Sequence, residues 1–345
     1  MKKRLLCLLA CLLLAGCSPA ATNEPPAQNP TQLPATKSYA LVVKSIENPY
    51  MTTMYEGFKT ACEQLQINPV IIGPGYNGTP NQPTVLASLL KQNIDGIAIA
   101  ANNMDEVSPM LAQCKAADIP VVSLDSMAYP GDRKVHIQQA SPETIGRVLI
   151  QACAKMMEGA GEFAILTTTD TMPNQALWVQ WMHRELADHP QQYQNLTLVE
   201  TVYGLDEDEP STQAAAYLLK TYPNLKMIIA PTVVGLRGAA AEIERTGSAV
   251  RVTGLGLPSA MEKYIANGIC PWMYLWNPSE VGYLAAYALD ALSNDSVQGN
   301  VGEILSAGSL GGKIITESMD GGTEIVLGNP KVFDTTNIAV WGELF

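Results

Sequence analysis

The side chains best suited to chemistry stand shortly after apolar runs of the sequence. Lys44 and Asp125 each follow such a run, and the pair Asn174–Gln175 stands a few residues beyond a third. A carboxylate accepts hydrogen bonds, a lysine donates them, and an amide does both. These residue types, brought together, indicate a binding site for a small polar molecule.

Motifs of the common catalytic and cofactor sites are absent from the sequence. Gly311–Lys313 is followed by Ile and not by the Ser or Thr of a phosphate-binding loop, and Gly254–Gly256 lacks the third glycine of a dinucleotide fingerprint. No Cys/His set has zinc spacing. The acidic run Asp206–Glu209 lacks the spacing of a calcium loop, so we interpret it as a solvated loop. We expect no cofactor and no metal.

Composition sets further limits on the function. The chain has 345 residues, which suits about two domains, and 47% hydrophobic with 16% charged residues suits a folded core. The formal net charge is −12. Such an acidic chain lacks the basic surface of a nucleic-acid binder, and we exclude that class of partner.

The N-terminal segment indicates export. Basic residues at positions 2–4 precede the apolar run Leu5–Ala15, which is too short to cross a bilayer as a mature helix. We therefore interpret 1–16 as a signal peptide. Leu14–Cys17 resembles the lipobox of bacterial lipoproteins, which implies attachment of lipid, with palmitate, at Cys17. The alternative is an ordinary signal peptide that happens to contain a cysteine.

The following segment, 17–38, is rich in Pro, Ala, Asn, Gln and Thr, and it is interpreted as a flexible tether. With the lipid anchor it places the protein on the extracytoplasmic face of a cell membrane, either at the surface of a single-membrane bacterium or in the periplasm. Four cysteines remain in the body, and we expect buried free thiols, with pairing left open. They are Cys62, Cys114, Cys153 and Cys270.

From Tyr39 onward, short apolar runs alternate with segments of helical periodicity. We expect strands at 40–43, 69–72, 96–100, 120–124, 162–166, 197–203, 226–230 and 250–253, with a helix between successive strands. This alternation is typical of parallel sheets covered on both faces. Segments 89–100 and 218–230 look like copies, so we predict an α/β fold of two doubly wound, Rossmann-like lobes. Ligands of such sheets bind beyond the carboxyl ends of the strands.

The body resembles the periplasmic sugar-binding proteins of ABC importers, in the class with three hinge crossings between two lobes. The likeness spans about 39–345 and rests on segments 43–50, 119–125, 228–231, 252–256 and 275–282. Lys44, Asn174–Gln175 ahead of Trp178, and Leu275–Trp276 resemble the rhamnose and autoinducer-2 branch. The resemblance implies an N-terminal lobe of 39–130 plus 277–303 and a C-terminal lobe of 131–276 plus 304–345.

The resemblance also implies which positions contact the ligand. The branch's positions fall on Lys44, Asp125, Asn174, Gln175, Pro231 and Val233. The wider class adds Asn48, Tyr50, Gly256, Trp276 and Asn277. The branch often has acidic residues where Asn174, Met127 and Asn277 stand, so the identity of the ligand stays open.

These residue types suit a polyol. Asp125 can accept from two adjacent hydroxyls, Lys44 can donate to the ligand or pair with Asp125, and aromatic rings at Tyr50 or Trp276 can cover a sugar's C–H face. Structural alternatives remain. Asp125 can cap a turn, Lys44 can lie on the surface, and Asn174 can be the N-cap of a helix. Tyr50 and Trp276 can belong to the core. Trp178 and Trp181 are interpreted as packing residues.

The sequence therefore predicts a lipid-anchored, monomeric solute-binding protein that delivers a monosaccharide or similar small polyol to an ABC permease without catalysis. One alternative is a subunit that presents its closed form to a membrane sensor kinase or chemoreceptor. Another is a sugar-active enzyme, which needs paired carboxylates in the cleft. Asp125 has no obvious partner in the sequence for that role.

Overall fold

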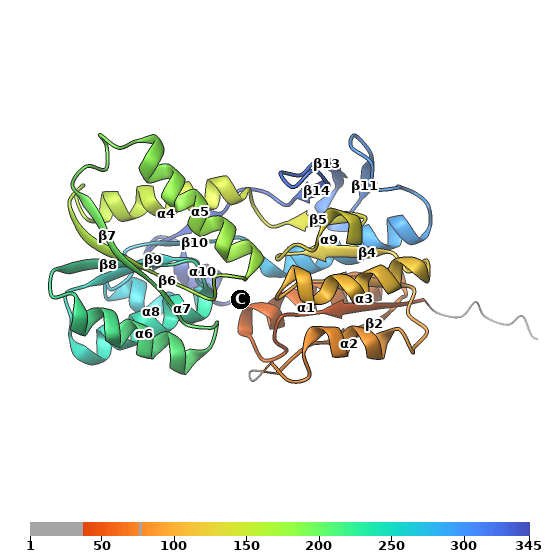
Figure 1. The fold of residues 1–345 in the computed structure, drawn as a ribbon, viewed down its shortest axis with the longest axis horizontal. Coiled ribbons are helices and arrows are strands. Elements are labelled where there is room, and N and C mark those ends of the chain that lie inside the picture. Colours follow the sequence, from red (N-terminus) through yellow and green to blue (C-terminus); the bar gives the residue numbers. More distant parts are fainter. Residues whose placement is uncertain (1–36, 76–77) are drawn as a thin grey trace, which may run out of the picture. The chain divides into compact units, whose positions relative to one another are not determined.

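The computed structural model describes residues 37–75 and 78–345 (Figure 1). The predicted signal peptide, the lipid-attachment cysteine and nearly all of the predicted tether lie outside these residues. Ser38, the last predicted tether residue, instead begins the first strand. Within the described part of the chain, no helix combines the length and the apolar character that a bilayer crossing requires.

A seven-stranded sheet forms the first lobe, in the order β13-β14-β5-β4-β3-β1-β2. All neighbours are parallel except β13 and β14. The strands are β1 (Ser38–Val42), β2 (Asn68–Ile72), β3 (Gly96–Ile99), β4 (Val121–Leu124), β5 (Val135–Gln138), β13 (Thr316–Glu317) and β14 (Thr323–Val326). The central strands β3 and β4 are buried along their whole length, as continuous apolar runs predict.

Helices cover both faces of the first sheet. On one face lie α1 (Pro49–Leu65) and α9 (Pro278–Ser293), and on the other lie α2 (Gln82–Leu89) and α3 (Met104–Ala116) (Figure 1). The backbones of α1 and α9 approach closely. A Cβ on Gly57 would lie 1.9 Å from Ser279 O, and one on Gly282 would lie 2.0 Å from Met54 O. Glycine at both positions therefore lets the two helices pack.

A four-stranded parallel sheet, β7-β6-β8-β9, forms the second lobe. Its strands are β6 (Gly161–Thr167), β7 (Leu196–Tyr203), β8 (Leu225–Ala230) and β9 (Arg251–Gly254). Its helices are α4 (Pro142–Met156), α5 (Pro173–Asp188), α6 (Asp208–Thr221), α7 (Val233–Thr246), α8 (Pro258–Ala266) and α10 (Ile338–Gly342). The helix pair α4 and α5 covers one face, and α6 and α7 cover the other (Figure 1).

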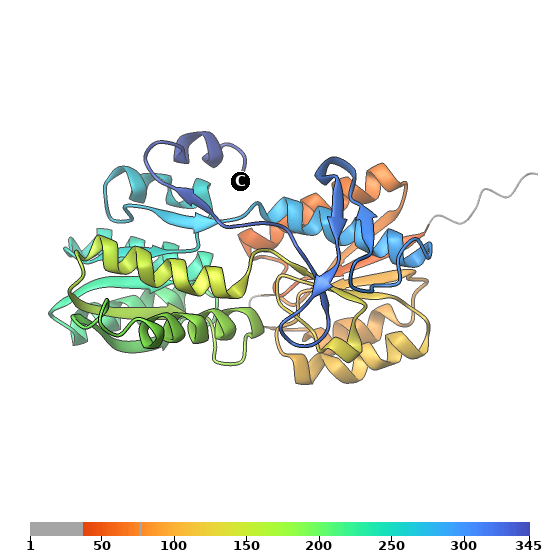
Figure 2. The ribbon, with the colours of Figure 1, turned by 90° about the horizontal axis from the view of Figure 1, so that it is seen from above.

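The chain passes between the lobes three times, as predicted. It crosses after β5, then between β10 (Met273–Leu275) and α9, and finally between β14 and β15 (Lys331–Phe333). Strand β10 pairs with β15, and Tyr274 also bridges to Leu255 beside β9, so both strands belong to the second lobe. Figure 2 shows the connecting segments between the lobes. The fold class is therefore confirmed.

The predicted lobe boundaries need correction. The predicted boundaries place strands β5, β13 and β14 in the C-terminal lobe, but all three belong to the first sheet. The hairpin of β11 (Ile304–Ser306) and β12 (Gly312–Ile314) also packs beside α9 of the first lobe. Strand β5 was missed because His136 and Gln138 interrupt its apolar residues, so it lacks the continuous run that marks the other central strands.

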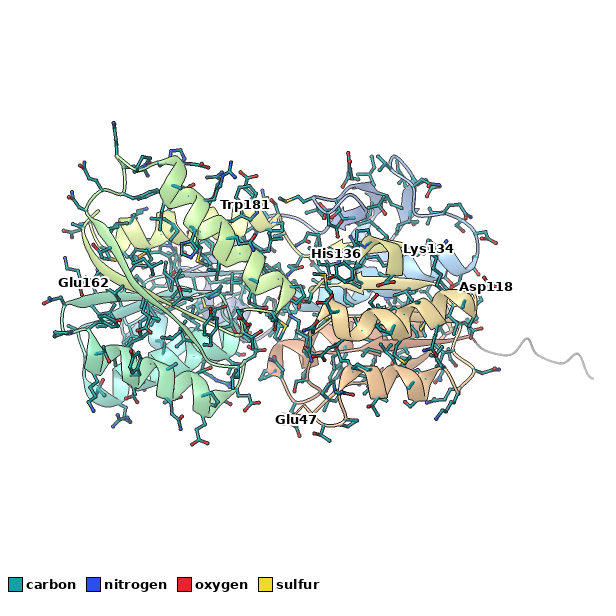
Figure 3. All side chains as sticks on the ribbon, viewed as in Figure 1. Glu47, Asp118, Lys134, His136, Glu162 and Trp181 are labelled. Carbon is teal, nitrogen blue, oxygen red and sulfur yellow. The ribbon has the colours of Figure 1, made fainter. Side chains whose placement is uncertain are left out.

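His136 is a histidine buried within the first sheet. It is fully buried on β5 (Figure 3), and Ser123 Oγ lies 2.8 Å from its Nδ1. Burial, with the Arg133 guanidinium as the second cause, lowers its pKa from 6.5 to about 3. Above pH 6.5 the ring is neutral in both the folded and the unfolded chain. Below that pH only the unfolded chain takes up the proton, so stability falls as the pH falls.

We therefore expect His136→Gln to flatten the acid limb of the stability curve. His136 contributes a loss of about 1.4 kcal/mol per pH unit below its unfolded pKa. The measurement is the free energy of unfolding in urea at several values between about pH 6.5 and pH 4.5. His183→Gln, at an exposed position, is the control. Equal slopes for the His136→Gln variant and the wild type would contradict the assignment.

Candidate functional site

A small cavity of about 30 Å³ lies where the carboxyl ends of the strands of both sheets meet. It is lined by Lys44, Asn48, Tyr50, Met51, Asp125, Gln175, Trp178, Asp206, Pro231, Thr232, Val233, Leu255, Leu275 and Trp276. Eight of the predicted binding residues are in this set, and they come from both lobes.

The parallel strands place these side chains. Lys44 follows β1 and Asp125 follows β4, so both stand at the carboxyl edge of the first sheet. Asn48 caps α1, accepting a hydrogen bond from Tyr50 N at 2.9 Å, and the Pro49 that follows is favourable at a helix start. Pro231–Val233 join β8 to α7 at the facing edge of the second sheet.

Lys44 and Asp125 form a buried ion pair. Lys44 Nζ lies 2.7 Å from Asp125 Oδ2, and the two side chains are 5% and 2% exposed. Lys44 is therefore buried and paired with Asp125, and it does not lie on the surface. Asp125 adopts a left-handed backbone with φ of 58°, which Asp and Asn tolerate better than most residues.

Further donors reach Asp125 from both lobes. Tyr50 OH donates to Oδ1 at 3.1 Å, and Gln139 Nε2 donates to the same oxygen at 3.2 Å. Asn174 Nδ2 of the second lobe donates to Oδ2 at 3.2 Å, and Asn174 Oδ1 accepts from Lys44 Nζ at 3.1 Å. Asn174 lies inside α5, whose N-cap is Met172, so the N-cap alternative for Asn174 is wrong. Asn174 instead joins the lobes.

Three aromatic rings enclose one side of the cavity. Trp276 Nε1 donates to Tyr50 OH at 2.6 Å, and the two rings meet edge to face with centroids 6.3 Å apart. Trp178 packs against Trp276 with centroids 5.8 Å apart. Burial, followed by the charge of Asp125, raises the pKa of Tyr50, which therefore stays a phenol donor. Trp178 lines the cavity, so its interpretation as a packing residue alone is incomplete.

Asp206 lines the cavity, although its sequence context does not single it out. Asn48 Nδ2 donates to its Oδ2 at 2.7 Å, Thr232 Oγ1 donates to its Oδ1, and the carboxylate lines the cavity. Burial raises its pKa, and the hydrogen bond from Thr232 opposes that rise. The interpretation of this residue as part of a solvated acidic loop is therefore wrong. Asp125 also shares its cavity with a second carboxylate.

The signal for Asp206 was its place three residues after the end of β7. Gln139 likewise follows β5 directly. Both positions obey the rule that sites form beyond the carboxyl ends of parallel strands. Strand β5 was not expected at all, and the end of β7 was interpreted only as an acidic run, so neither position was singled out.

Gly256 and Asn277, like Asn174, are not among the residues that line the cavity. A Cβ on Gly256 would lie 2.5 Å from Met273 Sδ, so glycine is needed there for packing. Asn277 Oδ1 accepts from Ser279 N at 3.1 Å and caps α9. Both residues have structural roles near the crossing between the lobes.

Within residues 37–75 and 78–345, no group of three His, Cys, Asp or Glu side chains is arranged to hold a metal ion. The four body cysteines are buried and unpaired. Burial raises the pKa of each thiol, to about 12 for Cys62 and about 11 for Cys114. Thiolate chemistry in this part of the chain is therefore disfavoured.

Comparison with known proteins identifies the family that this fold and cavity belong to. A family model described as a periplasmic binding protein domain matches residues 39–296. The chain is 38% identical, with a TM-score of 0.86, to an ABC transporter solute binding protein from Clostridium phytofermentas with bound L-rhamnose, covering 90% of this chain and 99% of that one.

Two more distant proteins share the fold or part of the sequence. LsrB from Clostridium saccharobutylicum, in complex with AI-2, has a TM-score of 0.82 at 19% identity, covering 88% of this chain and 99% of that one. The D-ribose/D-allose-binding protein of Pseudomonas aeruginosa is 22% identical over 76% of this chain and 82% of its own length. At such identities the structural likeness shows the fold alone.

Lys44→Met should strongly destabilise the protein, because it leaves the Asp125 carboxylate buried without its cation. We expect the free energy of unfolding to fall by about 3 kcal/mol. The double variant Lys44→Met/Asp125→Asn should recover most of that loss, since no uncompensated charge remains. The measurement is urea denaturation followed by circular dichroism.

The matched control is Lys59→Met, which breaks the exposed pair with Glu56, where the two side chains are 38% and 57% exposed. Exposed pairs contribute little to stability, so this variant should resemble the wild type. If Lys44→Met unfolds at the same urea concentration as the control, the buried pair has no structural role.

Proposed function

This chain belongs to the periplasmic binding protein family, and we propose that it binds a monosaccharide or similar small polyol for an ABC importer. Membership rests on the family model that covers 39–296 and on the 38% identity over nearly the whole of a solved solute-binding protein. The resemblance that the sequence predicted is thereby confirmed. As a member of this family, the protein works outside the cytoplasm.

The observation that carries the proposal is a cavity lined from both lobes by hydrogen-bonding groups and indole rings. Lys44, Gln175 and Asp206 offer both donors and acceptors. Trp178 and Trp276 offer apolar faces for the C–H groups of a sugar ring. Each buried polar group left unmatched costs about 1–3 kcal/mol, so a site of this kind separates epimers.

Ligand binding is proposed to hold the lobes closed. Lys44 with Asn174, and Asn48 with Asp206, already join the lobes across the cavity at 3.1 Å and 2.7 Å. A ligand seated between these groups contacts both lobes only in the closed form and therefore stabilises that form. The three crossings provide the hinge, and the closed protein presents itself to the permease.

Attachment to the membrane is the second part of the proposal. The basic start, the short apolar run and Leu14–Cys17 support lipid attachment at Cys17. The Pro-rich segment that follows supports a tether between the anchor and the body. Such an arrangement keeps the binding protein close to its permease.

A thermal-shift screen tests the binding function. L-rhamnose, D-ribose, D-allose, L-arabinose and AI-2 are the first probes. A ligand at about 100 times its dissociation constant adds about 2.7 kcal/mol to stability, which is readily seen as a rise in Tm. Val233→Trp places an indole in the cavity and should abolish the shift.

The matched control is Val340→Trp, at a position on α10 that is 67% exposed, and it should keep the full shift. A folded wild-type protein with no shift for any sugar would contradict the proposal.

Cys17→Ser should release the protein from the membrane fraction of the cells that express it. Incorporation of an alkyne analogue of palmitate, followed by fluorescent labelling, measures lipid attachment directly. Cys11→Ser, which changes another cysteine of the same leader, should label like the wild type. Equal labelling of the Cys17→Ser variant would place the lipid elsewhere.

A further inference from the structure

Gln139 is a buried amide at the first crossing between the lobes. Strand β5 ends at Gln138, and α4 begins at Pro142 after the Ser141 cap, so Gln139 belongs to the short segment that connects the lobes. Its side chain is fully buried, yet Gln139 is not among the residues that line the cavity. A buried amide needs hydrogen-bond partners at both its ends, so those partners determine its orientation.

Both ends of this amide are held. Gln139 Oε1 accepts from Gln138 Nε2 at 3.4 Å, and Gln138 Nε2 also donates to Ala140 O at 2.8 Å. At the other end, Gln139 Nε2 donates to Asp125 Oδ1 at 3.2 Å. A carboxylate only accepts hydrogen bonds, and the Nε2 group of Gln138 only donates them. The amide of Gln139 is therefore fixed in one orientation, with its donor toward Asp125.

The end of β5 holds Asp125 at a second point. The backbone N–H of Asp125 donates to Ile137 O at 3.2 Å. The last side-chain torsion of an aspartate is broad, so the plane of its carboxylate is set by its partners and not by the side chain itself. Segment 137–139 therefore restrains both the backbone and the carboxylate of Asp125.

Four side chains in the described part of the chain donate to the Asp125 carboxylate, and Gln139 differs from the other three. Lys44 and Tyr50 line the cavity, where ligand hydroxyls can take their place. Asn174 comes from α5 of the second lobe and is part of the contact between the lobes. Gln139 approaches Asp125 from outside the cavity, so a ligand in the cavity leaves this hydrogen bond in place.

We propose that Gln139 is the positioning residue for Asp125. It holds Oδ1 from outside the cavity and thereby fixes the plane in which the carboxylate presents its lone pairs to the hydroxyls of a ligand. Gln139 does not touch the ligand itself. The assignment rests on the proposed function, in which a polyol binds in the cavity beside Asp125, and it deepens that function. A carboxylate that is oriented before binding loses less freedom when the ligand arrives, so Gln139 contributes to affinity through Asp125.

Isothermal titration with L-rhamnose, D-ribose and D-allose compares the wild type with Gln139→Leu. Leucine fills a similar volume but donates no hydrogen bond, so Asp125 loses the partner that fixes its plane. We expect affinity to fall by about 10-fold or more, which is the effect of one hydrogen bond to a charged group. Gln113→Leu, at an exposed position on α3, is the matched control and should bind like the wild type.

A second variant, Gln139→Glu, distinguishes positioning from a general loss of packing. An ionised carboxylate at this position repels Asp125, whereas the protonated acid has the shape of the amide and donates to Oδ1 in its place. Burial and the neighbouring negative charge both favour the protonated acid, which forms as the pH falls. The affinity of this variant relative to the wild type should therefore rise about 10-fold or more between about pH 8.5 and about pH 5.5. For Gln139→Leu the same ratio should stay constant.

Other titratable groups lie around this pair. They are Lys44 and Tyr50 beside Asp125, Asp206 in the cavity, His136 on β5 and Glu324 on the adjacent strand β14. All of them are present in the wild type, so their titration cancels in the ratio of affinities at each pH. Gln113→Glu adds the same charge at an exposed position, and its ratio should stay near one throughout.

The outcomes separate this assignment from the proposed function. If the wild type binds a sugar and Gln139→Leu binds it equally well, Gln139 does not position Asp125, and the proposed function remains. A Gln139→Glu ratio that does not change with pH also overturns the assignment, because a merely structural defect has no such dependence. If Gln139→Leu fails to fold, the pH dependence of Gln139→Glu decides the question alone. A wild type that binds none of the sugars overturns both proposals.

Discussion

A lysine and an aspartate buried together between the lobes constrain the whole binding region. Charges removed from water each cost several kcal/mol, and their attraction offsets this only where the remaining lone pairs are also satisfied. For Asp125 that requirement brings Tyr50, Gln139 and Asn174 to one carboxylate. The segments after β1, β4 and β5, the start of α1, and α5 of the other lobe therefore have to converge. Parallel sheets achieve this because the carboxyl ends of their strands lie at one edge.

Packing far from the cavity fixes the same contacts. Tyr50 reaches Asp125 because α1 starts at the Asn48 cap, where Pro49 suits the first turn. The position of α1 in turn depends on α9, since Gly57 and Gly282 allow backbone contact that any larger residue would prevent. Helix α9, which comes late in the chain, thus helps to position Tyr50, which comes early in it. The cavity is in this sense a product of the three crossings.

The sequence predicts the structure best where a single local pattern determines the element. Continuous apolar runs located the central strands, and the residues after them, Lys44 and Asp125, line the cavity. Strand β5 is not predicted from the sequence because neighbouring strands bury its polar residues. Burial of that kind depends on strand pairing, which a local pattern does not reveal. The position of Asp206 at the cavity is not predicted because an acidic run is normally exposed to water. This carboxylate instead accepts hydrogen bonds from Asn48 and Thr232. Such contacts depend on residues far away in the chain.

Two polar atoms of the cavity wall, Gln175 Oε1 and Trp178 Nε1, also limit closure of the protein alone. A hydrogen bond between the lobes contributes about 0.5–1.5 kcal/mol, or about 1.5–3 when one partner is charged. Against this, Gln175 Oε1 and Trp178 Nε1 are buried without partners when the lobes meet, which costs about 1–3 kcal/mol each. The two sets of energies are comparable, so closure without ligand gains little. Under the proposed function, a matching sugar would remove this penalty and add its own contacts, so Gln175 and Trp178 would make closure depend on the ligand.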